Sequence, residues 1–328
     1  MEQIIMKQKM RLGLGQFSEL SEERLKFIKQ LGVEDVLLNT PQLPGTERWE
    51  FMDILHLRTE IENAGLRLAA LENVPVSFYD KAMLGLPGRD AQIENMATTI
   101  RNLGKAGVEI FGYHWMPNEV WRTSRTTLGR GGAAVTSFDM EQVKNAPLTH
   151  GRVYTENEIW ENYEYYMNAI LPVAEEAGVK LALHPDDPPV ESLAGVPRLF
   201  RNFEGFKRGM EIADSPIHGL DFCVGSWSEM GPGVTDAIRY FGERDKIFYV
   251  HFRDVQGHVP KFAESFVNNG NCDMFEVMRT LKEIGFTGFM ITDHVPHVVD
   301  DTDWGHRGRA YAIGYMTAFL EILMAVEK

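Results

Sequence analysis

The chain alternates short apolar runs with amphipathic stretches from one end to the other, and this alternation limits the folds open to it. Strands separated by helices indicate a parallel sheet with both faces covered. Turns such as AGLRL and AGVKL close the amphipathic stretches, where glycine suits a left-handed helix cap. The predicted strands cover residues 11–16, 33–39, 66–72, 108–113, 179–184, 218–223, 246–253 and 288–293. The first predicted helix ends at residue 31. The others cover residues 49–64, 90–106, 156–177, 203–212, 234–241, 274–284 and 306–326.

Eight strand–helix units without a break in composition predict one α/β domain over residues 1–328, a closed (β/α)8 or TIM barrel. The alternative is a doubly wound sheet, but the GLGQ that ends the first strand is not the GxGxxG turn of that fold. The connection 114–155 after strand 4 is too long for a plain loop, and its tryptophans and arginines favour a lid-like insertion over the barrel mouth. A shorter insertion, 75–89, is expected to line the same mouth.

Composition excludes several classes of partner. The net charge of −14 argues against a nucleic-acid surface, which needs a basic stripe. No apolar run approaches the roughly 20 residues that cross a bilayer, and the N-terminal MEQIIMKQKMRLGLG lacks the apolar core of a signal peptide. Two cysteines, Cys223 and Cys272, are too few for a disulfide framework. We expect a cytoplasmic protein with a small-molecule substrate and no membrane partner, and a homo-oligomer is compatible with these features.

Four predicted strands end in residues that can bind a metal ion, namely His184, Cys223, His251 and Asp293. Each has an ordinary explanation on its own, as a hydrogen-bonded histidine, a small buried thiol or a capping carboxylate. In a barrel, however, the carboxyl ends of the strands converge on one pocket. The four residues are therefore predicted to share one ion. Structural zinc sites are closed and cysteine-rich, whereas this mixed set suits a catalytic divalent ion and admits harder ions such as Mn²⁺.

Further polar residues flank these positions. Asp186 and Asp187 follow His184, and one of them is a candidate to orient a ligating histidine. Arg253 shares a strand face with His251, where a guanidinium suits a substrate carboxylate or, alternatively, a salt bridge at the rim. His294 directly follows Asp293 and is a candidate general acid or base. The remaining candidates are His114, which ends strand 4, and Arg309, Tyr311 and Tyr315 near the start of the last helix.

A metal ion, a carboxylate-binding arginine and an acid–base residue together predict chemistry next to a carboxylate. A metal stabilises the negative charge that forms when the C2 proton of a sugar acid leaves, and an acid protonates the departing C3 hydroxyl. The combination predicts dehydration of a sugar acid.

The segments LALHPDDPP, FCVGSW, VHFRDV, NGNCDMFEV and TDHVPHVVDD, in this order, resemble the mannonate dehydratases of bacterial hexuronate catabolism, which are xylose-isomerase-like barrels. This resemblance spans nearly the whole chain. It implies a hydro-lyase that converts D-mannonate, or a closely related sugar acid, to 2-keto-3-deoxygluconate. It further implies that the four strand-end residues bind Mn²⁺, with Fe²⁺, Co²⁺ or Zn²⁺ as alternatives. The resemblance makes His294 and Tyr311 (or Tyr315 in its place) catalytic, and Arg253 a substrate contact. From their positions at the end of strand 4 and the start of the last helix, His114 and Arg309 are further candidates for substrate binding.

Two other functions compete with this interpretation. A metal-dependent sugar isomerase or epimerase on a similar barrel usually surrounds its ion with several carboxylates, whereas this set contains a cysteine beside an arginine. A sugar-binding barrel without activity is expected to lack a ligand or the acid–base residue, and here both are present.

Overall fold

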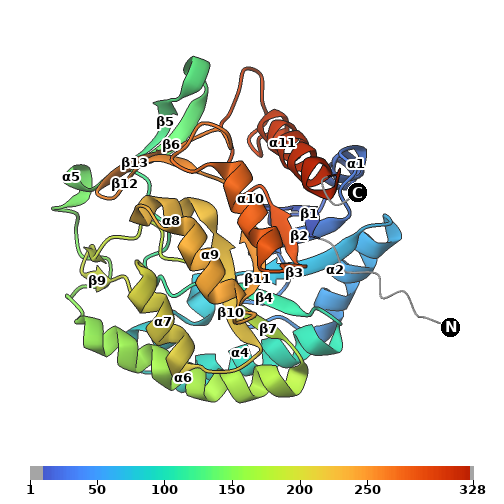
Figure 1. The fold of residues 1–328 in the computed structure, drawn as a ribbon. Coiled ribbons are helices and arrows are strands. Elements are labelled where there is room, and N and C mark those ends of the chain that lie inside the picture. Colours follow the sequence, from blue (N-terminus) through green and yellow to red (C-terminus); the bar gives the residue numbers. More distant parts are fainter. Residues whose placement is uncertain (1–9, 326–328) are drawn as a thin grey trace.

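The computed structural model describes residues 10–325 and confirms the closed barrel (Figure 1). Eight parallel strands close the ring in the order β1-β14-β11-β10-β7-β4-β3-β2. Each overlaps a strand predicted from the sequence. These barrel strands are β1 (Arg11–Leu14), β2 (Asp35–Asn39), β3 (Arg67–Glu72), β4 (Ile110–Tyr113), β7 (Lys180–Leu183), β10 (His218–Cys223), β11 (Ile247–His251) and β14 (Phe289–Ile291).

Helices cover the outside of the ring and also match the prediction. The predicted end of the last helix, Val326, lies outside the described residues, as do residues 1–9 of the segment that lacks signal-peptide features. The helices that follow the barrel strands are α1 (Glu22–Gln30), α2 (Phe51–Asn63), α4 (Arg89–Lys105), α6 (Glu156–Ala177), α7 (Phe203–Ile212), α9 (Val234–Gly242), α10 (Met274–Glu283) and α11 (His306–Ala325).

Local sequence explains where α6 begins and ends. The side chain of Thr155 accepts a hydrogen bond from the Glu158 backbone N–H, and the Glu158 carboxylate accepts one from the backbone N–H of Thr155. This reciprocal capping box satisfies two N–H groups that the first helical turn leaves free. At the other end Gly178 adopts a left-handed φ of 67°, which only glycine reaches at little cost. The chain then enters β7, whose end carries His184.

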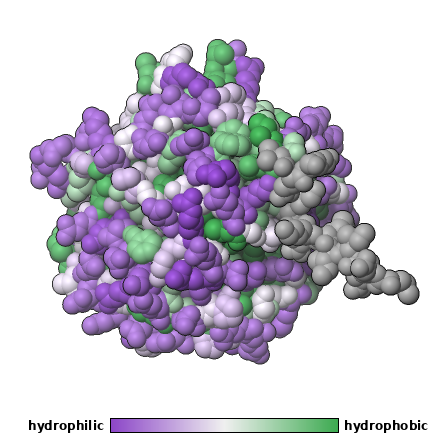
Figure 2. Space-filling view, viewed as in Figure 1, coloured by the Kyte–Doolittle hydropathy of each residue, from purple (hydrophilic) through white to green (hydrophobic). Residues whose placement is uncertain are grey.

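The core has two layers that follow from the alternation of strand side chains. The larger cluster lies between the strands and the helices, and it includes Ile28, Ile100 and Ile170. A smaller cluster comes from strands alone, as expected for side chains that point into the barrel, and includes Leu37 and Phe289. Figure 2 shows that the visible surface over the helices is mainly hydrophilic, with scattered apolar residues. Within residues 10–325, no helix combines the length and the apolar character that a membrane span requires.

Insertion 114–155 is more ordered than the predicted loop. It contains β5 (Ser124–Leu128) and β6 (Ala134–Asp139), and β6 pairs with β13 (Lys261–Glu264) from the connection after β11. With β12 (Val255–His258) these strands form a four-stranded antiparallel sheet beside the barrel (Figure 1). Sequence analysis missed this sheet because its central pairing joins segments that are far apart in the chain.

Shorter elements complete the description. They are η1 (Val76–Phe78), α3 (Asp80–Leu84), η2 (Arg130–Gly132), α5 (Met140–Val143), β8 (Ser192–Leu193), β9 (Val196–Pro197) and α8 (Val224–Met230). Of these, α8 matters most for the site because it starts directly after Cys223.

Candidate active site

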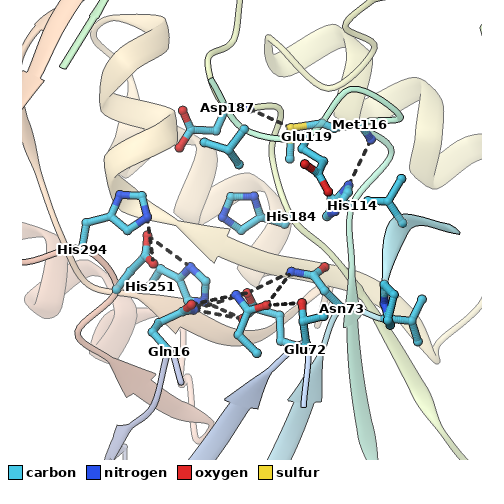
Figure 3. A pocket seen from close by; sticks show the side chains of 17 residues that line it. Gln16, Glu72, Asn73, His114, Met116, Glu119, His184, Asp187, His251 and His294 are labelled. Carbon is cyan, nitrogen blue, oxygen red and sulfur yellow. Dashed lines mark hydrogen bonds and ion pairs between the residues drawn. The ribbon is translucent and has the colours of Figure 1, made fainter. Parts of the chain in front are cut away.

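A cavity of about 330 Å³ opens at the carboxyl ends of the barrel strands (Figure 3). Three of the four predicted metal ligands line it, namely His184, His251 and Asp293, and His294 lies beside them. Cys223 is fully buried behind the same wall. Residues from both insertions, including Val76 and Val120, complete the wall.

The four predicted ligands converge as the strand-end rule required. One ligating atom from each of His184, Cys223, His251 and Asp293 lies within 4.8 Å of all the others. This spacing allows a single ion to contact every one of them. The cluster therefore fits a divalent metal ion held by two imidazoles, a thiolate and a carboxylate.

The orientation of the His251 ring is the clearest structural sign of a metal site. Its Nε2 lies 2.9 Å from Glu72 Oε2 and 3.3 Å from Asp221 Oδ2. Its Nδ1 is buried without a hydrogen-bond partner and lies 3.6 Å from Asp293 Oδ2. Because Nε2–H donates its hydrogen bond to these carboxylates, Nδ1 carries the lone pair, which faces the other candidate ligands. Ligating histidines are commonly oriented by such a carboxylate.

His184 is oriented differently from the prediction. Its Nδ1 lies 2.7 Å from the carbonyl oxygen of Pro185, which leaves Nε2 for a metal ion. Asp186 instead accepts the Phe200 backbone N–H, and Asp187 binds Arg122. Neither aspartate contacts His184 or His251, so the hypothesis that one of them orients a ligating histidine is wrong. Burial opposes charge on His184, but nearby Asp221 and Cys223 raise its pKa to about 10, because the cluster is strongly negative.

Cys223 lies in surroundings that favour a thiolate. Burial acts against ionisation of the thiol, but the Arg253 guanidinium and the two ligand histidines outweigh it and lower the pKa to about 5. The backbone N–H and the hydroxyl of Ser226 also donate to Sγ, at 3.5 and 3.3 Å. A thiolate is the form that binds metals.

Arg253 holds the cluster together instead of facing the cavity. Its Nε donates to Asp293 at 2.6 Å, Nη1 to Glu229 and Glu264, and Nη2 to Asp187 and Ser226. All five N–H groups therefore have protein acceptors. The predicted contact with a substrate carboxylate disagrees with this geometry, since no donor remains. These contacts instead match a salt bridge at the rim, the alternative role for Arg253. Because Arg253 binds Asp293 and lies close to Cys223, it is a positioning residue for the cluster.

Gly225 makes this arrangement possible and accounts for the glycine of FCVGSW. A Cβ at this position would lie 2.3 Å from Nη1 of Arg253. Gly225→Ala is expected to destabilise the fold by about 1–3 kcal/mol, because the fully bonded arginine cannot move aside. The exposed helical Gly314 has open space around it, so Gly314→Ala is a matched control that is expected to be neutral or slightly stabilising. Urea unfolding of both variants checks this, and equal stability would contradict the packing argument.

His294 is the candidate acid beside the ligand cluster. Its side chain is 40% exposed, and Nδ1 lies 2.8 Å from Glu264 Oε1. Burial disfavours the protonated ring, but Asp293 and Glu264 outweigh that effect and raise the pKa of His294. The ring therefore keeps a proton more readily than a free histidine does, as a general acid requires.

His114 lines the side of the cavity formed by the insertion after β4, and it is a neutral hydrogen-bond donor. Its Nδ1 accepts the backbone N–H of Met116 at 3.1 Å, so the ring proton sits on Nε2. Burial, assisted by the charges of His184 and Arg198, lowers the pKa of His114 to about 3. The predicted role in substrate binding is compatible with this placement.

The candidates on α11 lie away from the cavity. Arg309 is buried and donates to the carbonyl oxygens of Trp304, Thr292 and Asp293, so it supports the end of β14 and does not face the substrate as predicted. Tyr311 is 40% exposed and packs against Phe266, outside the cavity.

Tyr315 also packs within the helix surface, stacked on Tyr311 and close to Phe319. This agrees with the packing alternative for Tyr315. Tyr311 lines a separate small cavity together with Arg253 and His294, so it lies near the candidate acid but outside the main cavity, and its catalytic role stays a prediction.

Comparison with known proteins decides the family. A family model described as D-mannonate dehydratase (UxuA) matches residues 6–152 and 148–328. A mannonate dehydratase of Thermotoga maritima is 33% identical over 322 residues, which cover 87% of each chain. The chain belongs to the mannonate dehydratase family. Mannonate dehydratase 2 of Halalkalibacterium halodurans, 31% identical over 330 residues, agrees with this assignment and covers 92% of this chain and 93% of its own.

Solved structures give the same family. The mannonate dehydratase from Streptococcus suis serotype 2 is 30% identical, has a TM-score of 0.89 and covers 97% of this chain and 95% of its own. A D-psicose 3-epimerase from Clostridium cellulolyticum H10 shares 14% identity at a TM-score of 0.64, which shows the common barrel alone. The isomerase or epimerase alternative therefore has no better support than the mannonate dehydratase family, and the chain is a hydro-lyase.

Several cavity residues were missed by the sequence analysis of this mannonate dehydratase family member. Gln16, Asn39, Glu72 and Asn73 all line the wall formed by the first three strands. Their positions in the sequence could have identified them, because each lies at or just after the end of β1, β2 or β3. The first three strands end in amides and a glutamate, which are less distinctive than histidine or cysteine as candidate site residues.

Proposed function

We propose that this chain dehydrates D-mannonate, or a closely related sugar acid, to 2-keto-3-deoxygluconate with the help of a divalent metal ion. The proposal rests on a candidate metal cluster and a candidate general acid that lie side by side at the carboxyl ends of the barrel strands. The unpartnered Nδ1 of His251 points into a cluster of ligand atoms, and a histidine with a raised pKa lies directly beside it. The family assignment supplies the substrate class.

The donor set fits the ion that such a reaction requires. His184, Cys223, His251 and Asp293 would hold it, and Glu72 would keep His251 in the ligating tautomer. A bound divalent ion supplies a Lewis acid that stabilises negative charge next to the substrate carboxylate. We favour Mn²⁺ because a carboxylate ligand and a sugar-acid substrate add oxygen donors, with Fe²⁺, Co²⁺ and Zn²⁺ as the alternatives.

His294 is the residue proposed to protonate the departing C3 hydroxyl. Its Nδ1 is held by Glu264, so the Nε2 edge of the ring remains to donate a proton. On the facing wall the Nε2–H of His114 would donate to a substrate oxygen. Overall the reaction releases one water molecule: a base accepts the C2 proton, the proton from His294 joins the hydroxyl that leaves C3, and the resulting enol tautomerises to the 2-keto-3-deoxy acid.

The proposed pathway and compartment follow from the chemistry. We propose that the protein acts in hexuronate catabolism in the cytoplasm, because that pathway requires the removal of water from a hexonate. Insertion residues between β4 and β5, including Met116, Glu119 and Val120, line the cavity, which suits the predicted lid over a substrate.

A substrate panel tests the proposal. Protein reconstituted with Mn²⁺ is incubated separately with D-mannonate, D-gluconate, D-galactonate and D-fructose, and products are identified by NMR. We expect 2-keto-3-deoxygluconate from D-mannonate at the highest rate and no change in D-fructose. Epimerisation of the ketose without dehydration of any hexonate would contradict the proposed function.

A further inference from the structure

The part of the cavity wall next to His251 carries three amide side chains, those of Gln16, Asn39 and Asn73, arranged around the carboxylate of Glu72. Figure 3 shows Gln16, Glu72 and Asn73 beside His251. Asn39 Nδ2 donates to Gln16 Oε1 at 2.7 Å and to Glu72 Oε1 at 2.9 Å. Asn73 Nδ2 donates to Asn39 Oδ1 at 3.2 Å, while its own Oδ1 has no partner. The amides are thus held in fixed orientations, with hydrogen-bonding capacity left at Asn73.

The backbone near these strand ends adopts the left-handed conformation, which strains residues other than glycine. Gln16, Thr40 and Asn73 have φ angles of 62°, 45° and 57°, and Glu119 on the next wall has 57°. All four line the cavity. A side chain in the left-handed region costs free energy, and such residues concentrate at functional sites where the structure enforces them. Glycine would avoid this cost at each position, so the polar side chains themselves explain why the strain is kept.

The charge of the wall indicates what it can bind. Among the described residues that line the cavity, none is lysine or arginine, whereas Glu72 and Glu119 are carboxylates. A substrate carboxylate has no cationic side chain to meet here, so it belongs at the metal cluster and its histidines. Asn39 Nδ2 already donates to Gln16 and Glu72, and Asn73 Nδ2 to Asn39 and Glu72. A substrate hydroxyl would therefore accept from the remaining N–H of Gln16 and donate to the buried, unpartnered Oδ1 of Asn73. A second carboxylate at this wall would be repelled by Glu72, around which the amides are arranged.

We propose that Gln16, Asn39 and Asn73 form a subsite for the hydroxyl groups farthest from the substrate's carboxylate, and that this subsite selects polyhydroxy monoacids over shorter acids and diacids. The inference rests on the proposed function for the position of the carboxylate. The subsite adjoins the ligand cluster, since Gln16 Nε2 is 3.4 Å from His251 Nε2. Gln16, Asn39 and Asn73 line the same cavity as His184, His251 and Asp293, so a single chain-like substrate can contact both sets.

Calorimetric binding to Mn²⁺-reconstituted protein tests the subsite separately from turnover when every chain compared, including the one called wild type in this experiment, carries His294→Asn, which removes the proposed acid. The ligands are D-mannonate, the three-carbon D-glycerate, which lacks the distal hydroxyls, and the six-carbon diacid D-mannarate. Wild-type protein is expected to bind D-mannonate at least about 10-fold more tightly than either of the others, the effect of one or two hydrogen bonds. Asn73→Gly, which also relieves the strained φ, is expected to weaken D-mannonate binding up to about 10-fold at unchanged metal content, and Gln16→Gly is expected to do the same.

Asp245→Gly is the matched control, because Asp245 has a φ of 55° at a position that does not line the cavity. It is expected to bind all three acids as the wild type does. Unchanged D-mannonate binding in Asn73→Gly and Gln16→Gly, or wild-type affinity for D-glycerate equal to that for D-mannonate, would overturn the subsite. Tight D-mannonate binding that depends on these amides, together with no dehydration by the chain that retains His294, would refute the proposed function and leave the subsite standing.

Discussion

Cys223→Ser is expected to lose its metal ion while the barrel remains folded. The thiol has a pKa of about 5 and supplies a full negative charge, whereas a serine hydroxyl stays neutral. Loss of a partner that merely orients a ligand lowers metal affinity by roughly 10- to 100-fold, and loss of a ligand is expected to exceed this. Metal content after dialysis against a weak chelator, measured by mass spectrometry, checks the prediction.

Cys272→Ser provides the control for this experiment. It makes the same chemical change at the other cysteine, which lies outside the ligand cluster and near α10. Its metal content and circular dichroism are expected to match those of the wild type. Equal metal retention in both serine variants would remove Cys223 from the ligand set.

His294→Asn is expected to lower kcat by about 10²- to 10⁴-fold, the usual contribution of a positioned general acid. Metal content should stay at the wild-type level, because His294 is not among the four converging ligands. Asparagine retains hydrogen bonding with Glu264 but cannot transfer a proton at neutral pH. Steady-state kinetics with D-mannonate and parallel metal analysis separate this effect from loss of the ion.

His297→Asn is the corresponding control three residues further on. His297 is exposed, and its bridge to Ala134 is made by backbone atoms, so its substitution should leave kcat within a few-fold of the wild type. Activity of His294→Asn close to that of His297→Asn would exclude His294 as the acid.

The barrel and the convergence of the four candidate ligands could be predicted from sequence because both follow from local regularities. Apolar runs and helix caps recur with each βα unit, and parallel strands bring their ends to one rim. His184, Cys223, His251 and Asp293 needed only that rule. The antiparallel sheet of β5, β6, β12 and β13 could not be predicted in this way, because its pairing depends on contacts between distant segments.

The roles of Arg253 and Arg309 show a different limit. Sequence places a guanidinium next to a ligand but does not reveal how many acceptors surround it. Arg253 meets Asp187, Glu229, Glu264 and Asp293, which come from four separate parts of the chain. Only their three-dimensional arrangement shows that the arginine is fully occupied. The buried Oδ1 of Asn73, which has no hydrogen-bond donor, can likewise be recognised only in the folded protein.

Titration of Mn²⁺ into metal-free protein, with bound metal and conversion of D-mannonate followed together, tests the central claim most directly. We predict that 2-keto-3-deoxygluconate formation rises in proportion to bound ion and reaches its maximum at one ion per chain. Full activity in the metal-free protein, or a saturated site that produces no 2-keto-3-deoxy acid, would contradict a metal-dependent dehydratase.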